Sequence, residues 1–245
     1  MILKLDFKIK NKELQLPISY NHIVQSFIYN NISQKLANFL HNEGYMYKKR
    51  IFKFFVFSKL EGKFKLNKAE HKIKFFDGIR IRINSPMDIF CQEFANSMIN
   101  SDNLNLIGNK IVVDQINFDK PEIYKNEILA KTMSPIVMYS TIEKPNGKKF
   151  TYYFQPGDPD YTDMISDNLI KKYNALNKKD IKFENIKIKK ITSGKMRRMS
   201  YKKFAIRAWD GKIKIEGPKE LLKLGIESGF GGKNSQGFGY LDIIN

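Results

Sequence analysis

The sequence predicts an α+β protein built from two tandem units of the order β-α-β-β-α-β. Hydrophobic residues make up 42% of the 245 residues and aromatic residues 13%, which is enough for a packed core. In the first half, stretches that alternate apolar and polar residues are interleaved with stretches of helical period. The same order of elements recurs after a polar, proline-containing segment at residues 118–127. This order is the ferredoxin-like, or RRM-like, arrangement.

The first half is expected to hold a strand, a helix, two strand runs, a second helix and a final strand run, at residues 2–9, 16–44, 49–62, 72–85, 86–101 and 104–118. Ser19 or Asn21 is placed to cap the first helix, and Gly44 lies just past its end. The pair Asp77-Gly78 predicts a hairpin inside the fourth element.

The second half is expected to repeat this order, with strand, helix, two strands, helix and strand at residues 128–140, 160–176, 181–192, 201–217, 218–229 and 239–244. Pro218 suits the first turn of the last helix. The two halves share no letter-by-letter repeat, so the duplication depends on element order alone. We therefore expect one ferredoxin-like domain at residues 1–122 and a second at residues 123–245.

The charge predicts a polyanionic partner. Lys and Arg number 43 against 25 Asp and Glu, a net charge of +18. Residues 180–215 alone contribute +9, from 12 basic and 3 acidic residues. The two dense clusters are Lys48, Lys49 and Arg50, and Lys195, Arg197 and Arg198. Lysines at solvated strand edges are the alternative explanation, but arginines beside glycines favour phosphate contacts.

A membrane partner is not expected, because no apolar run is long enough to span a bilayer. The first residues alternate like a strand and lack the apolar core of a signal peptide, so we expect a cytoplasmic protein. The single cysteine, Cys91, excludes an internal disulfide. His22, His41 and His71 show no metal-ligand spacing, so neither a metal nor a cofactor is expected.

His41 is the histidine best placed for chemistry. It lies in FLHNEG at the end of the first predicted helix, where the helix dipole favours the imidazolium. Such a position suits proton transfer near neutral pH. The alternative is a surface histidine that only stabilises the helix end.

The segment GIESGFGGKNSQGFG holds six of the 15 glycines. Its pattern Gly-x-Gly-Gly-x-x-x-x-Gly-x-Gly, from Gly229 to Gly239, resembles the signature of the Cas6 family, CRISPR-associated endoribonucleases of the RAMP superfamily. LPISYNHIVQSFIYNNI, LHNEG followed by FKFFVFS, and TMSPI at residues 132–136 resemble further family segments. The family fold, two tandem ferredoxin-like domains, agrees with the order of elements given above.

The resemblance implies a metal-independent endoribonuclease that cleaves CRISPR repeat RNA in precursor transcripts to produce guide RNAs. The RNA 2′-hydroxyl would attack phosphorus, leaving a 2′,3′-cyclic phosphate and a 5′-hydroxyl. The family positions match Tyr29, His41 and Lys53: His41 as general base or acid, Lys53 as the cation for the phosphorane, and Tyr29 to orient the hydroxyl or transfer the other proton. Lys49 or Arg50 could replace Lys53, and His22 could contribute in a variant site.

The resemblance also implies that the glycine-rich segment contacts RNA backbone. The residues expected to do so are Gly231, Gly232, Lys233, Asn234 and Ser235, with main-chain N–H groups facing phosphates. Beyond repeat RNA, the expected partners are other CRISPR effector subunits or a second copy of the chain, and the sequence leaves both open. The alternative function is a non-catalytic RNA-binding RAMP subunit of a CRISPR surveillance complex. A generic RRM-like protein is less favoured, because no aromatic RNP signature is evident.

Overall fold

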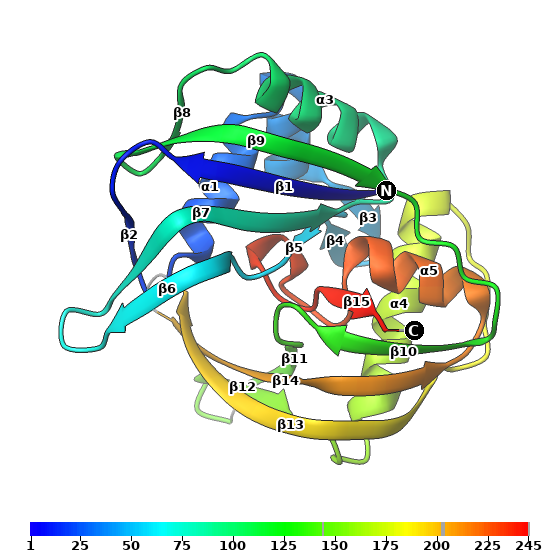
Figure 1. The fold of residues 1–245 in the computed structure, drawn as a ribbon. Coiled ribbons are helices and arrows are strands. Elements are labelled where there is room, and N and C mark those ends of the chain that lie inside the picture. Colours follow the sequence, from blue (N-terminus) through cyan, green and yellow to red (C-terminus); the bar gives the residue numbers. More distant parts are fainter. Residues whose placement is uncertain (144, 202–203, 245) are drawn as a thin grey trace.

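Two antiparallel sheets form the framework of the protein in a computed structural model, which describes residues 1–143, 145–201 and 204–244 (Figure 1). The first sheet consists of β1 (Ile2–Ile9), β2 (Leu14–Pro17), β5 (Val56–Phe57), β6 (Glu61–Asn67), β7 (Lys72–Asn84), β8 (Leu104–Leu106) and β9 (Asn109–Asp119). The second consists of β10 (Glu127–Thr132), β13 (Lys187–Tyr201), β14 (Phe204–Glu216) and β15 (Leu241–Ile243).

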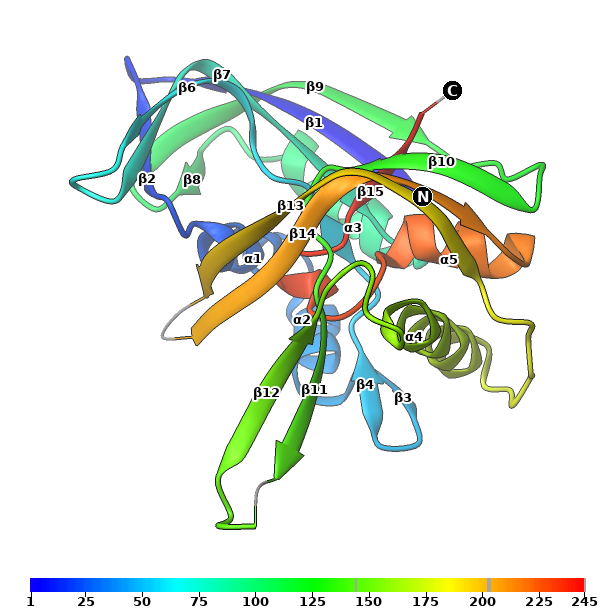
Figure 2. The same cartoon turned by 90° about the horizontal axis from the view of Figure 1, so that it is seen from below.

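Helices and two small hairpins gather on one side of these sheets (Figure 2). The helices are α1 (Asn21–Asn30), α2 (Gln34–Asn38), α3 (Asp88–Ile99), α4 (Tyr161–Asn177) and α5 (Lys219–Ser228), with a π-helical turn η1 (Phe39–Glu43) and a 3₁₀ turn η2 (Asn234–Gln236). The hairpins pair β3 (Tyr45–Tyr47) with β4 (Arg50–Phe52), and β11 (Met138–Glu143) with β12 (Lys149–Phe154). The β11–β12 hairpin projects from the body of the molecule in Figure 2.

The strand order confirms the α+β, ferredoxin-like fold class. The first sheet runs β2-β7-β1-β9-β8, and the second runs β13-β14-β10-β15. In each, the first strand of the unit therefore lies between the third and the fourth, which is the ferredoxin-like pattern. The two largest hydrophobic clusters each draw residues from both halves of the chain, because the first includes Ala175 and Leu224 and the second includes Ile2. The division into domains at residues 122 and 123 stays a prediction.

The hairpin expected at Asp77-Gly78 is wrong. β7 runs without interruption from Lys72 to Asn84, and Gly78 pairs with Lys8 of β1. Asp77 does take a left-handed φ of 68°, but the register with β6 shifts between Glu61 and Lys63, so the irregularity is a bulge. The turn that reverses the chain is the one between β6 and β7.

The first helix is also shorter than expected. α1 starts after Tyr20 without a side-chain cap and ends at Asn30, and the Ser33 hydroxyl then caps α2 by accepting from the Leu36 N–H. In the second half, the run at 128–140 divides into β10 and β11, and β12 was not expected at all. The described residues contain no helix long and apolar enough to cross a membrane.

Candidate active site

His41 lies where the helical segment ends. The π-helical turn closes through the Gly44 N–H, which donates to the Phe39 carbonyl at 2.7 Å. Gly44 has a φ of +62°, and a Cβ there would lie 2.8 Å from the Phe52 carbonyl oxygen, so glycine is required for the turn into β3. The turn leaves the His41 side chain exposed.

Tyr29, His41 and Lys53 come together from three different segments. The ring centroids of Tyr29 and His41 are 6.3 Å apart in an edge-to-face arrangement. The Lys53 ammonium donates to the main-chain carbonyl of His41 at 2.7 Å. These contacts bring together a phenol, an imidazole and an ammonium, groups that can donate a hydrogen bond, transfer a proton and stabilise developing negative charge.

Hydrogen bonding orients the imidazole of His41. Its Nδ1 lies 2.9 Å from Asn42 Oδ1, an oxygen that can only accept. In the neutral ring Nδ1 therefore carries the proton, and Nε2 keeps its lone pair for a second partner. This geometry makes Nε2 the atom able to act as a base.

Burial changes the pKa values of the two neighbours of His41. Burial, with a smaller contribution from nearby Tyr201, raises the pKa of Tyr29 to about 12. Burial also lowers the pKa of Lys53 from its ordinary value. At neutral pH the Tyr29 hydroxyl therefore keeps its proton. It can donate a hydrogen bond, but it cannot act as a base.

Lys53 occupies a break between strands, where a continuous strand over 49–62 was expected. The chain leaves the β3–β4 hairpin at Phe52 and enters the first sheet at β5, and between them Phe54 takes a φ of 51°. The Phe54 carbonyl accepts from the buried Ser85 hydroxyl at 2.6 Å. A bulky residue in the left-handed region is strained, and such strain concentrates at functional sites.

The alternatives to this trio lie at other places. His22 faces Tyr201 with ring centroids 6.4 Å apart, and it lines a different hollow near residues 105–107. Lys48 and Lys49 form the exposed tip of the β3–β4 hairpin, whereas Arg50 shares a hollow with Lys53. Of the two alternatives to Lys53, Arg50 is therefore the one that lines the same hollow. The catalytic roles of Lys53, Arg50 and His22 stay predictions.

The glycine-rich segment 229–239 is a folded loop that packs on the rest of the protein. Phe230 and Phe238 are buried. The Asn234 amide lies inside the loop, where its Nδ2 donates to the carbonyls of these two phenylalanines at 3.2 and 3.0 Å. On one side, Asn21 of α1 donates to the carbonyls of Gln236 and Gly237. The loop therefore joins the two halves of the chain.

The glycines serve this internal packing. Gly231 has a φ of +71°, and a Cβ there would lie 2.4 Å from the Val137 carbonyl oxygen. The N–H of Gly232 donates to that same oxygen at 2.8 Å. This N–H therefore already has a partner within the protein. RNA contacts by the loop as a whole stay a prediction.

Lys172 of α4, which the sequence analysis missed, supports the loop from below. Its side chain is buried, and its ammonium donates to Gly229 O at 2.5 Å, Asn234 Oδ1 at 2.8 Å and Ser228 O at 3.4 Å. Burial lowers its pKa to about 7. A signal existed, because Lys172 continues the helical period of the apolar residues Ile165 and Leu169.

A hollow of about 250 Å³ lies between the β3–β4 hairpin, α4 and the glycine-rich loop. Arg50, Lys53, Lys172 and Lys233 line it, and no acidic residue does so in the described part of the chain. Lys233 also lies over the Tyr139 ring, with its ammonium 4.8 Å from the ring centroid. This arrangement attracts anions and offers them aromatic surface.

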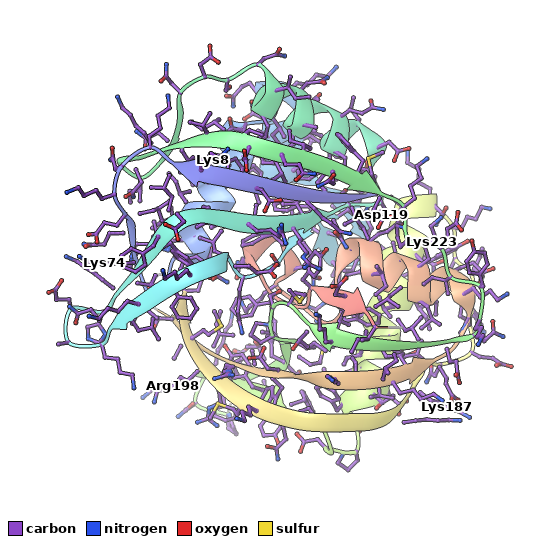
Figure 3. All side chains as sticks on the ribbon, in the orientation of Figure 1. Lys8, Lys74, Asp119, Lys187, Arg198 and Lys223 are labelled. Carbon is purple, nitrogen blue, oxygen red and sulfur yellow. The ribbon has the colours of Figure 1, made fainter. Side chains whose placement is uncertain are left out.

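The second basic cluster lies on a strand, whereas the expected strands left residues 193–200 as the connection between them. Lys195, Arg197 and Arg198 belong to β13, next to a register shift between Thr192 and Lys195. Arg197 forms an ion pair with Asp210 at 2.6 Å. Arg198 is exposed and stands out from the strand in Figure 3. Within residues 1–143, 145–201 and 204–244, no three His, Cys, Asp or Glu side chains gather closely enough to hold a metal ion.

Comparisons with known proteins agree with this picture. The family model described as CRISPR associated protein Cas6, C-terminal, matches residues 118–243. The chain is 32% identical over 231 residues to CRISPR-associated endoribonuclease Cas6 1 of Methanocaldococcus jannaschii, covering 91% of this chain and 85% of the relative.

Two solved structures share the fold over the full chain. One, a CRISPR associated protein Cas6, is 27% identical with a TM-score of 0.80, covering 100% of this chain and 99% of that chain. The other, described as a RAMP protein binding different RNA substrates, is 22% identical with a TM-score of 0.84 and covers 100% of both chains. The family match, the identity to the archaeal relative and the shared fold lead to one conclusion: the chain belongs to the Cas6 family.

Proposed function

We propose that the protein is a metal-independent endoribonuclease that cuts CRISPR repeat RNA within precursor transcripts and so produces guide RNAs. The observation that carries this proposal is the meeting of Tyr29, His41 and Lys53 at the edge of a hollow lined with cations. Membership of the Cas6 family and the endoribonuclease name of the archaeal relative support it.

The reaction is an internal transesterification. The 2′-oxygen forms a bond to the adjacent phosphorus while the bond from phosphorus to the 5′-oxygen breaks, which leaves a 2′,3′-cyclic phosphate and a 5′-hydroxyl. His41 Nε2 accepts the 2′-hydroxyl proton, a role that contributes about 10²–10⁴-fold. Tyr29, whose hydroxyl stays protonated, donates a hydrogen bond to the reacting oxygens. The leaving 5′-oxygen takes its proton from water, and the His41 imidazolium returns to water the proton that it accepted. The Lys53 cation stabilises the charge on the phosphorane.

Basic side chains around the site supply the affinity for RNA. Lys48, Lys49 and Arg50 lie on the hairpin beside the hollow, and Lys233 and Ser235 on the loop across from it. Lys195 and Arg198 extend the basic surface along β13. Arg197 contributes less, because its guanidinium is already paired with Asp210, a carboxylate that also pairs with Lys59. Association with other CRISPR effector subunits or with a second copy stays a prediction.

The test is a cleavage assay in EDTA with repeat RNA from the protein's own genome. We expect one cut in unmodified RNA, no cut when the 2′-hydroxyl at that position is replaced by hydrogen, and a rate about 10²–10⁴-fold lower for His41→Ala. His71→Ala, which removes an exposed histidine from the β6–β7 turn, is the matched control and should cleave normally.

Three results would each contradict a part of this proposal. Loss of cleavage in EDTA with recovery on adding metal would show metal-dependent chemistry. Tight binding without cleavage by any variant would instead favour the alternative, a non-catalytic RNA-binding subunit. If His22→Ala abolished cleavage while His41→Ala did not, the variant site would be correct.

A further inference from the structure

The outer half of the β11–β12 hairpin has one apolar face and one polar face. The register places Ile142 opposite Phe150 and Ser140 opposite Tyr152, so these four side chains share a face. Ile142 is 56% exposed, Phe150 47% and Tyr152 41%, and we call these three residues the hairpin strip. The opposite face carries polar pairs at the same height. They are Thr141 with Thr151, and Glu143 with Lys149.

The hairpin strip continues the protein core into solvent. The next pair on the same face is Met138 with Phe154, and both side chains pack in the second hydrophobic cluster. The ring of Tyr152 meets that of Phe154 with centroids 4.8 Å apart. Beyond this point the hairpin projects from the molecule (Figure 2). A two-stranded hairpin alone in water is only marginally stable, and apolar surface bordered by polar residues is typical of an interaction site.

Acidic residues border the strip at the base of the hairpin. Residues 150–170 contain four aspartates and none of the 43 lysines and arginines. Asp158 accepts a hydrogen bond from the Tyr152 hydroxyl at 3.2 Å, so the acidic segment begins beside the strip. Asp160 and Asp163 are exposed. Carboxylates repel phosphate groups, and an aliphatic side chain such as Ile142 cannot stack on a base, so this surface favours a protein partner over RNA.

A lysine borders the strip at the other end. Lys148 is exposed in the turn between β11 and β12. Along the hairpin the order is therefore acidic base, apolar strip and basic tip. This order is complementary to itself when a second hairpin lies on it in the opposite direction: strip meets strip, and the tip of each hairpin meets the base of the other. A two-fold axis produces this arrangement, because it uses the same patch on both copies.

We propose that the β11–β12 hairpins of two copies of this chain pack strip to strip, antiparallel, and so form a two-fold dimer. The dimer goes beyond the proposed function and does not depend on it. The contact places Lys148 of each copy near Asp160 of the other. Because the strip consists of only three side chains, the interface belongs to the small, transient class, with a dissociation constant of about 1–100 µM.

Sedimentation velocity of the purified chain without RNA, at concentrations of about 1–100 µM, tests the dimer. We expect the wild type to shift from monomer to dimer over this range. Ile142→Asp places a carboxylate in the strip and should weaken association by at least about 10-fold. Ile99→Asp is the matched control. Ile99 is 65% exposed on α3, outside the hairpin, and its variant should associate like the wild type.

A charge exchange tests the antiparallel arrangement. Lys148→Glu or Asp160→Lys alone places like charges opposite each other in both contacts of the dimer, and each should weaken association by about 10-fold. An equal mixture of the two variants restores opposite charges in both contacts of the mixed dimer and should associate like the wild type. The Asp160 side chain does not cap α4, so the exchange removes no hydrogen bond from that helix. Thermal unfolding of each variant shows that it is folded.

Three results would overturn the proposal. A wild type that stays monomeric up to about 100 µM would exclude the dimer. A dimer that survives Ile142→Asp would be formed by another surface. Charge variants that associate no better together than apart would exclude the antiparallel arrangement. If Ile142→Asp instead weakened RNA binding in a monomeric protein, the strip would be an RNA contact. Cleavage of repeat RNA is measured separately, so the proposed function stands or fails on its own result.

Discussion

Replacing Lys172 with methionine removes a buried ammonium from beneath the glycine-rich loop while nearly preserving the volume of the side chain. The ammonium donates to Gly229 O, Asn234 Oδ1 and Ser228 O, and each hydrogen bond to a charged group contributes about 1.5–3 kcal/mol. Opposing this, burial lowers the pKa of Lys172 to about 7, since the charged form loses its hydration. The balance therefore depends on pH.

The direction of that dependence follows from proton binding. In the unfolded chain a lysine has a pKa of about 10.4 and keeps its proton between pH 7 and 9. The folded protein releases the proton over this range, because its Lys172 has a pKa of about 7. The unfolded state then binds more protons, so the free energy of unfolding rises with pH. The expected gain from pH 7 to pH 9 is about 2 kcal/mol.

Urea unfolding at pH 7, 8 and 9 measures this gain, with the fluorescence of the single tryptophan, Trp209, as the signal. The unfolding free energy of the wild type minus that of Lys172→Met should rise by about 2 kcal/mol from pH 7 to pH 9. Burial raises the pKa values of Cys91 and Tyr29, which lowers stability at alkaline pH, but it does so in both proteins and cancels in the difference.

Lys171→Met is the matched control, since this neighbouring side chain pairs with Asp167 at the surface. Its stability should follow the wild type at every pH. Parallel curves for wild type and Lys172→Met would refute the reasoning, because they would mean that Lys172 keeps its proton in the folded protein throughout the range.

Three further changes test the site and the loop. Arg198→Ala should make the slope of log affinity for RNA against log salt shallower by about 0.7. Arg197→Ala should change this slope by less, because its guanidinium is already paired with Asp210, which also pairs with Lys59; equal changes would contradict this. Gly239→Ala should lower the urea midpoint more than Gly108→Ala does, since both have a φ near +80° but only a Cβ at Gly239 meets a backbone oxygen, at 2.0 Å. Tyr29→Phe should slow cleavage by a constant factor from about pH 6 to 9, because a group with a pKa of about 12 does not titrate there; a shifted pH profile would assign Tyr29 a proton-transfer role.

The fold was predictable from the sequence because alternation and helical period act along contiguous residues. The prediction failed at Asp77-Gly78, because this pair of residues is typical both of a hairpin turn and of a bulge within a strand. Asp77-Gly78 does produce the positive φ that the pair predicts, but the partner strand continues past it, and a Cβ at Gly78 would lie 2.6 Å from the Phe7 carbonyl oxygen. Local chemistry fixed the backbone conformation there, whereas long-range pairing with β1 decided that it would be a bulge.

The candidate site was less predictable, because its contacts join distant residues. Tyr29 and Lys53 were expected only through the resemblance to the Cas6 family. His41 was also indicated by its position at a predicted helix end, but periodicity gave no reason to join the three residues. Asn168 and Gln236, which line the hollow beside Lys53, were missed, since an amide on a helix or in a loop looks like any surface residue until its surroundings are known. Lys172 alone left a sequence signal, a lysine on an apolar helix face.

The same contacts explain why glycine is concentrated in one loop. Gly231 and Gly239 bring backbone against backbone, where any Cβ would collide with the carbonyls of Val137 and Phe230. The loop is therefore closely packed, although its composition resembles that of a flexible linker. Its ordering entropy is lost during folding, so RNA meets a surface that is already formed. Lys233 then lines the hollow from a fixed position. A substitution that loosens the loop should therefore weaken RNA binding even if it leaves the side chains proposed to bind RNA unchanged.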